Sequence, residues 1–376
     1  MKIAYTGGGT GGHVYPIIAV NEELMDIYDD EKFIDQGVYF FSNTPYNEEL
    51  LQRNFIEYIH VPAGKMRMYP SFQNFIDIFK TLYGIIVAFV KLYKIMPDVV
   101  FGKGGYSSFP TVFAAWMIGI PIVIHESDVA PGRANTLCGR FATFICVSYE
   151  EAREYFAKKD KVIHTGQPIR RALQTRLDEE FAYEGINHNK KTLLVIGGSQ
   201  GAQIFNNLMI QLAPNLVKTH NILHIAGAKN YANQKQVIDS VLARNPDKDS
   251  YILFEYVDEI LLRKLYSAAD AALTRAGSTL FEIACFAVPS IVVPFTVSNR
   301  DHARKNAFAF AATGAGTVIE EANLSDEIFM QELTFIETDE RFKQAAETFP
   351  SLQLHRHAAK TIAELLITVA KEHYKQ

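Results

Sequence analysis

The chain has 376 residues, enough for two domains of ordinary size, each with its own hydrophobic core. Hydrophobic residues make up 48% of it and charged residues 21%, a composition that excludes extensive disorder. The formal net charge of −5 argues against a general nucleic-acid binder, because no basic excess is available to displace counterions. The cysteines show no metal-ligand spacing, so we expect reduced core residues of a cytoplasmic protein without a signal peptide; they are Cys138, Cys146 and Cys285.

The first half alternates short apolar strands with helices. This order predicts a parallel sheet with right-handed crossovers. The expected strands are residues 2–6, 37–41, 58–61, 99–101, 121–125, 144–147 and 161–164. The expected helices are residues 15–28, 47–54, 72–96, 108–118 and 130–139.

The helix expected over residues 72–96 is unusually apolar for a soluble protein. Its longest uncharged run, residues 81–90, is about half of the roughly 20 residues that a spanning helix needs. One interpretation is a helix buried in the domain. The other places one face on a membrane surface, together with the preceding loop of cations, Met and Tyr at residues 65–69. Both can hold at once, with the C-terminal half of the helix in the core and the loop and first turns on lipid.

The second half repeats the scheme after a turn at residues 166–170 and a polar stretch at residues 174–191, where we place the domain boundary. The expected domains are residues 1–165, joined by a final helix at about residues 355–376, and residues 166–354. The strands expected in the second domain are residues 192–196, 222–226, 251–254, 271–274, 290–294 and 316–319. Its expected helices are residues 203–216, 232–243, 257–268, 279–286, 303–313 and 325–335.

Two glycine-rich turns, residues 7–13 and residues 197–202, each follow an apolar strand and open an expected helix. Such a turn presents backbone N–H groups and the positive end of a helix dipole, which together bind anions, most often phosphate. One turn in each half predicts twin α/β domains that face each other across a cleft. A dinucleotide fingerprint also matches, but the second strand ends at Ser42 and Asn43 without the carboxylate that would hold a ribose, so dinucleotide binding is disfavoured.

Several polar residues of the first half follow expected strands. His13 is either a structural cap of its turn or a general base, because a near-neutral pKa beside phosphate suits proton abstraction. A second glycine turn, residues 101–110, is either a plain tight turn or a further phosphate cradle with donors from Lys103, Tyr106 and Ser107. Glu126 and Asp128 follow the next strand, where residues line the crevice of open α/β sheets.

In the second half, Gly198, Ser199 and Gln200 are expected to hold a pyrophosphate at the helix that begins near Ala202. Glu282 lies on an apolar helix and is expected to accept hydrogen bonds from ribose hydroxyls. The sequence has no HExxH motif and no CxxC pair. Asp247-Lys-Asp249 is expected to be a solvated loop, and we expect no bound metal.

These motifs, in this order, resemble the MurG family, the UDP-N-acetylglucosamine:N-acetylmuramyl-(pentapeptide) pyrophosphoryl-undecaprenol N-acetylglucosaminyltransferases of peptidoglycan synthesis. The resemblance covers nearly the whole chain. It implies the GT-B fold: two Rossmann-like domains with parallel sheets that face each other across a cleft, and a C-terminal helix that crosses back to the first domain. The motifs are residues 6–16, 102–110, 124–126, 166–170, 197–201 and 275–277, with Glu282, Asn306 and Ala307.

Carried over residue by residue, the resemblance assigns roles in both domains. His13 and Glu126 are the implied catalytic residues. The implied donor contacts are Arg170, Gly198, Ser199, Gln200, Val257, Glu282 and His302. The implied acceptor contacts are Thr10, Gly11, Gly12, Lys103, Gly104, Tyr106 and Asp128. Ala303 stands where the family usually has a glutamine in the donor sugar site, which leaves Asp301 and His302 as polar candidates.

The implied reaction is inverting transfer of GlcNAc from UDP-GlcNAc to the 4-hydroxyl of MurNAc in undecaprenyl-diphosphate-linked MurNAc-pentapeptide, which turns lipid I into lipid II without a metal cofactor. The implied location is peripheral, on the cytoplasmic face of the bacterial cell membrane. The alternatives are a GT-B transferase with another lipid acceptor, a UDP-GlcNAc 2-epimerase and a non-catalytic nucleotide-sugar-binding protein. A nicotinamide oxidoreductase is disfavoured by the missing acidic residue.

Overall fold

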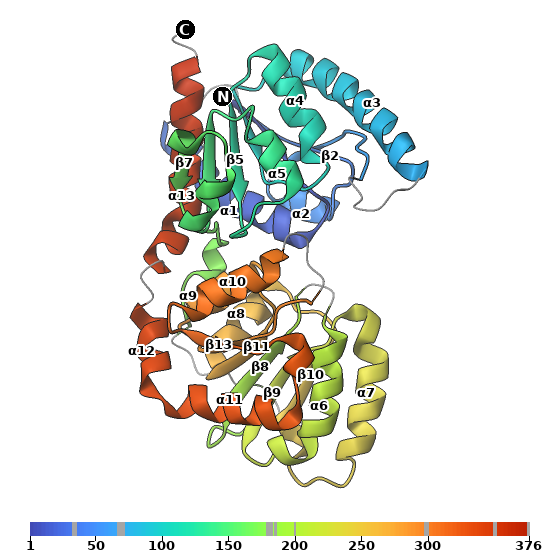
Figure 1. Ribbon diagram of the computed structural model, residues 1–376, viewed down its shortest axis with the longest axis vertical. Helices are drawn as coiled ribbons and strands as arrows, with labels where there is room; N and C mark the ends of the chain where they lie inside the picture. The colour runs from blue at the N-terminus through green and yellow to red at the C-terminus, as the bar shows by residue number, and fades with distance from the viewer. Residues whose placement is uncertain are drawn as a thin grey trace. The chain divides into compact units, whose positions relative to one another are not determined.

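The computed structural model divides into two compact units, residues 1–170 with 354–376 and residues 171–353 (Figure 1). It describes residues 1–31, 36–65, 72–177, 183, 186–198, 201–296, 301–348 and 352–373. The two units meet in sequence between Arg170 and Arg171, five residues after the expected boundary, so the turn at residues 166–170 belongs to the first unit.

The first unit is built on a seven-stranded parallel sheet in the order β3-β2-β1-β4-β5-β6-β7. The inner strands are near-continuous apolar runs, as expected for a sheet covered on both faces, whereas the edge strand at residues 57–60 is Glu-Tyr-Ile-His. All five residues of β5 are buried, for example. The strands are β1 (Lys2–Thr6), β2 (Gly37–Ser42), β3 (Glu57–His60), β4 (Val99–Gly102), β5 (Ile122–Glu126), β6 (Phe144–Val147) and β7 (Val162–His164).

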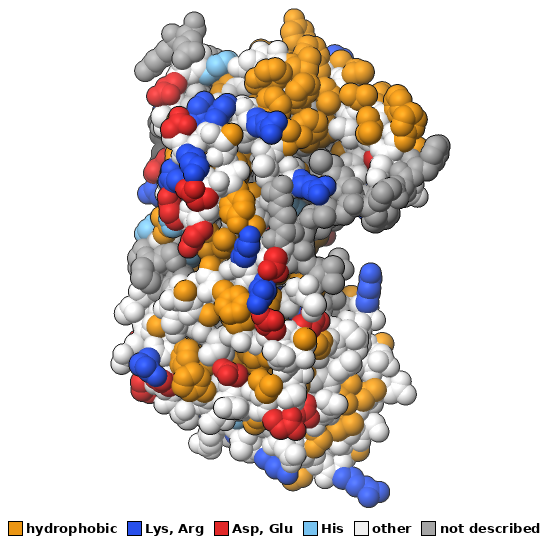
Figure 2. Space-filling model, in the orientation of Figure 1, with side chains coloured by type: hydrophobic (Ala, Val, Ile, Leu, Met, Phe, Trp, Pro, Cys, Tyr) orange, Lys and Arg blue, Asp and Glu red, His pale blue; other side chains and the backbone are white. Residues whose placement is uncertain are grey.

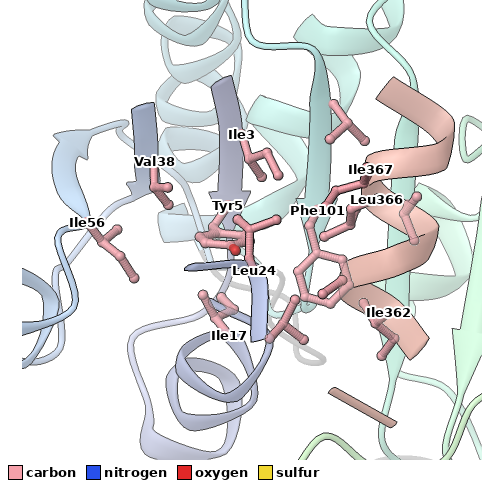
Figure 3. Close-up of a cluster of buried hydrophobic side chains, with 14 of the residues drawn as sticks. Ile3, Tyr5, Ile17, Leu24, Val38, Ile56, Phe101, Ile362, Leu366 and Ile367 are labelled. Atoms are coloured by element: carbon pink, nitrogen blue, oxygen red, sulfur yellow. The ribbon is translucent and has the colours of Figure 1, made fainter. Parts of the chain in front are cut away.

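Helices cover both faces of this sheet (Figure 1). On one face, Ile3, Tyr5 and Phe101 of the strands pack against α1 and against Ile362 and Leu366 of α13, so the C-terminal helix completes the core of the first unit (Figure 3). The other face packs against α3, α4 and α5. The helices are α1 (Gly11–Glu31), α2 (Glu48–Arg53), α3 (Phe72–Ile95), α4 (Ser108–Ile118), α5 (Arg133–Cys138) and α13 (Leu352–His373).

The second unit has a six-stranded parallel sheet in the order β10-β9-β8-β11-β12-β13, and its strands and helices share a buried hydrophobic cluster. Its strands are β8 (Lys191–Ile196), β9 (His220–Ile225), β10 (Tyr251–Phe254), β11 (Ala271–Thr274), β12 (Ser290–Val292) and β13 (Gly316–Val318). Its helices are α6 (Gln203–Leu216), α7 (Ala228–Leu242), α8 (Glu259–Ala268), α9 (Thr279–Cys285), α10 (His302–Ala311), α11 (Asp326–Thr338) and α12 (Glu340–Thr348).

The structure confirms the parallel sheets, and it differs from the expected elements in α1, α12 and α3, among others. Helix α1 begins at Gly11, four residues before the expected start, so its first turn includes the glycines of the turn. Helix α12 was not expected, because it is short and strongly polar. In α3 the buried residues are Gly84, Ala88 and Leu92, and apolar side chains are exposed along the whole helix rather than on its first turns alone.

No helix in the described part of the chain is long and apolar enough to cross a membrane.

Candidate active site

The strand order of the first unit brings two glycine-rich loops together. From β1 the chain proceeds outward to β2 and β3, and then returns to β4 on the other side of β1. Ligands of open α/β sheets bind at such a switch point, beyond the carboxyl ends of the strands. The loop after β1 is residues 7–10 and the loop after β4 is residues 103–107. The topology therefore places both expected phosphate cradles at one edge of one sheet.

The two loops are in backbone contact, which requires glycine. A Cβ atom on Gly105 would lie 2.8 Å from the Cα and 2.9 Å from the N of Gly8, and Gly105 has a φ of +79°. Gly104 has a φ of +93°, and its Cβ would lie 2.7 Å from Nδ2 of Asn135. Only a residue without a side chain fits both the conformation and the space. Ser42, at the end of β2, donates a 2.8 Å hydrogen bond to the carbonyl of Gly7 and so supports the loop from below.

His13 lies in the first turn of α1, with Nδ1 2.7 Å from Oγ1 of Thr10. Burial, and then the neighbouring charge of Lys103, lowers the pKa of His13 to about 4. The imidazole is therefore neutral near pH 7, the form that accepts a proton. In the tautomer whose Nδ1–H donates to Oγ1 of Thr10, Nε2 has a free lone pair that can accept a proton. The capping role and the role as a base are thus compatible in one side chain.

Lys103 places a buried ammonium group beside this imidazole. It is 2% exposed, and its Nζ donates a 2.5 Å hydrogen bond to Oγ of Ser127. Burial lowers the pKa of Lys103 to about 8, against the opposing charges of Glu126 and Asp128. The ammonium group of Lys103, close to the two glycine loops, would attract an anionic ligand to this edge of the sheet.

Glu126 organises the loop that follows β5. Its carboxylate accepts hydrogen bonds from the backbone N–H of Asp128 (2.9 Å), the backbone N–H of Gly132 (3.3 Å) and Nδ2 of Asn135 (2.9 Å). Burial, and next the charge of Asp128, raises the pKa of Glu126 to about 7. These three bonds are internal to residues 126–135, so the side chain holds this loop in place.

A buried polar network, which the sequence did not reveal, continues from Lys103 to the C-terminal helix. Ser127 and Ser148 both donate to Oε1 of Gln167, at 2.7 and 2.9 Å. The backbone N–H of Gln167 donates to Nδ1 of His355 in α13, 2.9 Å away. Gln167 was visible in its turn motif, but no local signal linked it to a histidine almost 190 residues later.

The remaining first-unit candidates lie around these loops. Arg170 is buried, with its guanidinium carbon 4.0 Å from the centre of the Tyr15 ring, so this expected donor-side cation belongs to the first unit. Tyr106 and Asp128 are half-buried. Thr10 and Gly12 are exposed and Gly11 is buried.

The second unit has its switch point between β8 and β11. The loop after β8 contains Gly198 and Gly201, with φ values of +89° and +72°. A Cβ on Gly201 would lie 2.0 Å from the carbonyl oxygen of Ala226, the residue after β9. The loop therefore packs closely against the end of this strand. Ser199 and Gln200 lie outside the described residues. The helix that follows, α6, points its N-terminus at this edge, as expected for a phosphate site.

Glu282 is a half-buried residue of α9, the helix that follows β11. The buried Tyr266 donates a 3.0 Å hydrogen bond to its Oε2. Val257 is half-buried and immediately precedes Asp258, the N-cap of α8. His302 is half-buried as the first residue of α10, and Ala303 is 3% exposed.

Arg275 has a role that the sequence did not indicate. It follows β11 at the switch point, but its guanidinium donates to the carbonyl of Val293 at 3.1 Å and pairs with Glu321 at 3.3 Å. It also lies over the ring of Phe295, 4.2 Å from its centre. The charge is therefore used to hold the ends of β11 and β12 together. Among the residues that the structure describes, no group of three or more His, Cys, Asp or Glu could hold a metal ion.

Comparison with known proteins identifies the family. The model for the glycosyltransferase family 28 N-terminal domain matches residues 3–147, and the model for the family 28 C-terminal domain matches residues 192–366. A curated protein of Clostridium botulinum (strain Loch Maree / Type A3) is 35% identical over 340 residues, 89% of this chain and 90% of its own. It is named UDP-N-acetylglucosamine--N-acetylmuramyl-(pentapeptide) pyrophosphoryl-undecaprenol N-acetylglucosamine transferase. The chain belongs to the MurG family of glycosyltransferases.

Other members and solved structures agree with this family. A protein of the same name from Legionella pneumophila (strain Lens) is 36% identical and covers 88% of each chain. The crystal structure of MurG from Acinetobacter baumannii matches with a TM-score of 0.71 at 22% identity, over 98% of this chain and 99% of its own. A UDP-GlcNAc 2-epimerase from Neisseria meningitidis, bound to UDP-GlcNAc, matches with a TM-score of 0.69 at 18% identity, over 98% of this chain and all of its own. The fold is thus the GT-B fold of this family, and the sequence relatives separate transferase from epimerase.

Proposed function

We propose that the protein transfers GlcNAc from UDP-GlcNAc to the 4-hydroxyl of MurNAc in an undecaprenyl-diphosphate-linked MurNAc-pentapeptide, with inversion at the anomeric carbon. The observation that carries the proposal is the meeting of two glycine loops at the switch point of the first unit, beside a neutral His13 and the buried Lys103. In a member of this family, such a site supports an acceptor whose diphosphate requires an anion site and whose hydroxyl requires a base.

On the acceptor side, the backbone N–H groups of the glycine loops and the Lys103 ammonium would bind the diphosphate. Nε2 of His13 would take the proton of the 4-hydroxyl as that oxygen attacks the anomeric carbon. Thr10 holds the ring by Nδ1, and Glu126 and Asn135 hold the loop that bears Ser127, the hydrogen-bond partner of Lys103. The role of Glu126 in this scheme is to position the site.

On the donor side, the second unit would bind UDP-GlcNAc. The loop at residues 197–202 and the N-terminus of α6 would stabilise the negative charge that develops on the leaving diphosphate. The carboxylate of Glu282, oriented by Tyr266, would accept hydrogen bonds from the ribose hydroxyls. We propose Val257 and His302 as further donor contacts, because both lie at the starts of helices, α8 and α10, in this unit. Attack on the face opposite the departing UDP inverts the anomeric configuration.

We propose that this reaction needs no metal ion. The developing charge on the diphosphate would be met by backbone N–H groups and a helix N-terminus, which supply stabilisation without a cation. Turnover in excess EDTA should therefore equal turnover without it, and a rate that EDTA abolishes and Mg²⁺ restores would contradict this part of the proposal.

We propose that the protein attaches peripherally to the cytoplasmic face of the membrane through the outer face of α3 and α4, where hydrophobic side chains gather (Figure 2). Such a contiguous exposed apolar surface marks an interaction site. Exposed Lys80, Lys91 and Lys94 on α3 add attraction to anionic headgroups of about 1 kcal/mol each. The exposed apolar residues are Phe75, Ile76, Ile78, Phe79, Leu82, Tyr83, Ile86, Val90, Tyr93, Trp116 and Met117. The loop residues Met66, Arg67, Met68 and Tyr69, expected to share this role, lie outside the described residues.

Sedimentation with anionic vesicles tests the membrane face. The double variant Ile86→Ser, Tyr93→Ser should lose vesicle binding, and Val241→Ser, an exposed apolar position in the second unit, should retain it. Equal binding by the double variant and the parent protein would place the membrane contact elsewhere.

The transfer itself is tested by incubating the purified protein with UDP-GlcNAc, with and without a lipid-linked MurNAc-pentapeptide acceptor. We expect UDP release that depends on the acceptor, together with a product that carries GlcNAc. Acceptor-independent conversion of UDP-GlcNAc would favour an epimerase, and binding of UDP-GlcNAc without conversion in either mixture would favour a nucleotide-sugar-binding protein.

A further inference from the structure

A cavity of about 400 Å³ opens in the first unit between α3, α4 and α5, outside the site described above. Its apolar lining is Ile78, Leu82 and Ile85 of α3, Phe109 of α4 and Leu137 of α5. We call it the α3–α5 groove. Its volume lies within the roughly 300–1,000 Å³ of small-ligand sites, so it accommodates one apolar segment rather than a complete long lipid.

Two backbone groups in the wall of the groove, the N–H of Gly64 and the carbonyl of Asp77, are hydrogen-bonded internally. The N–H of Gly64, in the wall, donates to Oγ1 of Thr81 at 3.2 Å, and that hydroxyl donates to the carbonyl of Asp77 at 2.8 Å. A Cβ on Gly64 would lie 2.0 Å from the same carbonyl oxygen, so the loop is closed against α3. Such a wall presents mainly apolar atoms to an occupant.

The groove shares two elements with the acceptor site. On α5, Arg133 and Leu137 are four residues apart and lie on one face, which lines the groove. Asn135, between them, is buried on the other side, where it donates to Glu126. On α4, Phe109 lines the groove and is the second residue of the helix that follows the loop with Lys103 and Gly104. The helix α5 and the start of α4 therefore border the groove on one side and the acceptor site on the other.

The charges at the groove select an apolar chain that ends in an anion. Lys65 and Arg133 are exposed cations of its lining, and Asp77 is the acidic residue there. The groove also shares Ile78 and Leu82 with the exposed apolar face of α3, so a chain can extend from it into a lipid surface. A neutral apolar ligand would not need the two cations.

We propose that the α3–α5 groove binds the isoprenoid segment next to the diphosphate of the lipid-linked acceptor, and so selects acceptors by the start of their chain. This inference rests on the proposed function, because the acceptor is the diphosphate lipid assigned there. The groove holds the first isoprene units out of water while the diphosphate lies at the glycine loops, and the rest of the chain stays in the membrane.

The test compares two soluble acceptors with the same MurNAc-pentapeptide diphosphate, one with a geranylgeranyl chain and one with an ethyl group, in detergent without vesicles. For the parent protein, kcat/KM should be about tenfold or more higher with the prenyl acceptor, because several methylene-sized groups leave water. Leu137→Trp, which fills the groove, and Leu137→Asn, which makes it polar, should bring this ratio close to one. Val241→Trp, on the exposed surface of the second unit and outside the groove, should keep the ratio of the parent.

A photoreactive prenyl diphosphate gives a readout that does not depend on activity. Its crosslinks to the parent protein should map to residues of α5 and the start of α4. An excess of prenyl diphosphate without the photoreactive group should suppress their formation. An unchanged chain ratio in both Leu137 variants, or crosslinks confined to Ile86 and Tyr93, would overturn the inference. The inference would also be overturned if phosphatidylglycerol, but not prenyl diphosphate, suppressed crosslinking in the groove, because an acyl chain would then be the occupant. If neither acceptor receives GlcNAc, the proposed function fails; if both do at a groove-independent ratio, only this inference fails.

Discussion

The sheets of the two units have the same strand order around the switch point, but different side chains lie at that point. In the first unit, the edge of the sheet carries two titratable side chains, the half-buried His13 and the buried Lys103, and a polar network runs from Lys103 to α13. In the second, Arg275, which follows β11 at the switch point, is paired with Glu321 and the carbonyl oxygen of Val293, and the glycine loop offers backbone groups.

This difference indicates that the two units have different functions in the reaction. Imidazole and ammonium groups with shifted pKa values suit proton transfer and binding of an anionic acceptor, whereas backbone N–H groups at a helix N-terminus suit binding of a diphosphate and stabilisation of the charge that develops on it as it leaves. Changes in the first unit should therefore affect the rate of the chemical step, and changes in the second should affect donor affinity.

The largest effect is expected at His13. His13→Ala removes the proposed base, so kcat should fall by roughly 10²–10⁴-fold while the affinity for UDP-GlcNAc stays near that of the parent. Thr10→Ala is the matched variant, because it keeps the imidazole but removes its 2.7 Å contact, and it should lose less. Steady-state kinetics and calorimetric donor titration check both. Near-normal turnover of His13→Ala would show that the histidine is structural and that a carboxylate such as Asp128 is the base.

The glycine loops of the two units should differ in their tolerance of a methyl group. Gly105→Ala combines a φ of +79° with a Cβ 2.8 Å from Gly8, so the loops of the first unit must separate and activity should fall by about tenfold or more. Gly198→Ala has a similar φ of +89° but nothing within 4 Å of the new Cβ. It should show only the backbone cost of about 1–2 kcal/mol.

Thermal unfolding and transfer assays of the two glycine variants, with Gly132→Ala as a control that has open space and an ordinary φ, check this prediction. Equal loss of activity in Gly105→Ala and Gly132→Ala would mean that contact between the loops does not matter.

Donor affinity should depend on Glu282. Glu282→Ala removes a charged acceptor for the ribose hydroxyls, so UDP binding should weaken by roughly 1–3 kcal/mol. Glu347→Ala, an exposed carboxylate of the same unit, is the control for charge. Calorimetry with UDP gives both values, and an unchanged affinity in folded Glu282→Ala would remove this residue from the donor site.

The last effect concerns pH and a buried histidine of the second unit. His224 is buried, with Nδ1 2.6 Å from the Tyr251 hydroxyl, and burial lowers its pKa to about 3. The unfolded chain, with a pKa near 6.5, binds this proton first. Stability is therefore fully present above pH 6.5 and is lost as pH falls toward 3.

From pH 6.5 to pH 5 the loss from His224 should be about 2 kcal/mol. His224→Asn keeps an acceptor for Tyr251 but does not titrate, so its unfolding free energy should fall less over this range. Urea denaturation at the two pH values measures the difference, and equal losses would show that this histidine does not contribute to the acid sensitivity.

Local patterns predicted the strands, both glycine turns and the place of Glu282, because each depends on a few consecutive residues. Long-range contacts did not follow from such patterns. The contact of Gly105 with Gly8 arises from the strand order, and the bond between Gln167 and His355 joins distant segments. The exposure of α3 along its whole length was missed because an apolar helix in a core and one on a surface have similar compositions.

The structure of the product tests the central claim most directly. Purified protein, UDP-GlcNAc and the lipid-linked MurNAc-pentapeptide acceptor are incubated, and the disaccharide released from the product by mild acid is analysed by NMR. The account predicts GlcNAc in β linkage to the 4-hydroxyl of MurNAc. An α linkage, attachment to another hydroxyl, or recovery of the sugar as its 2-epimer without transfer would contradict it.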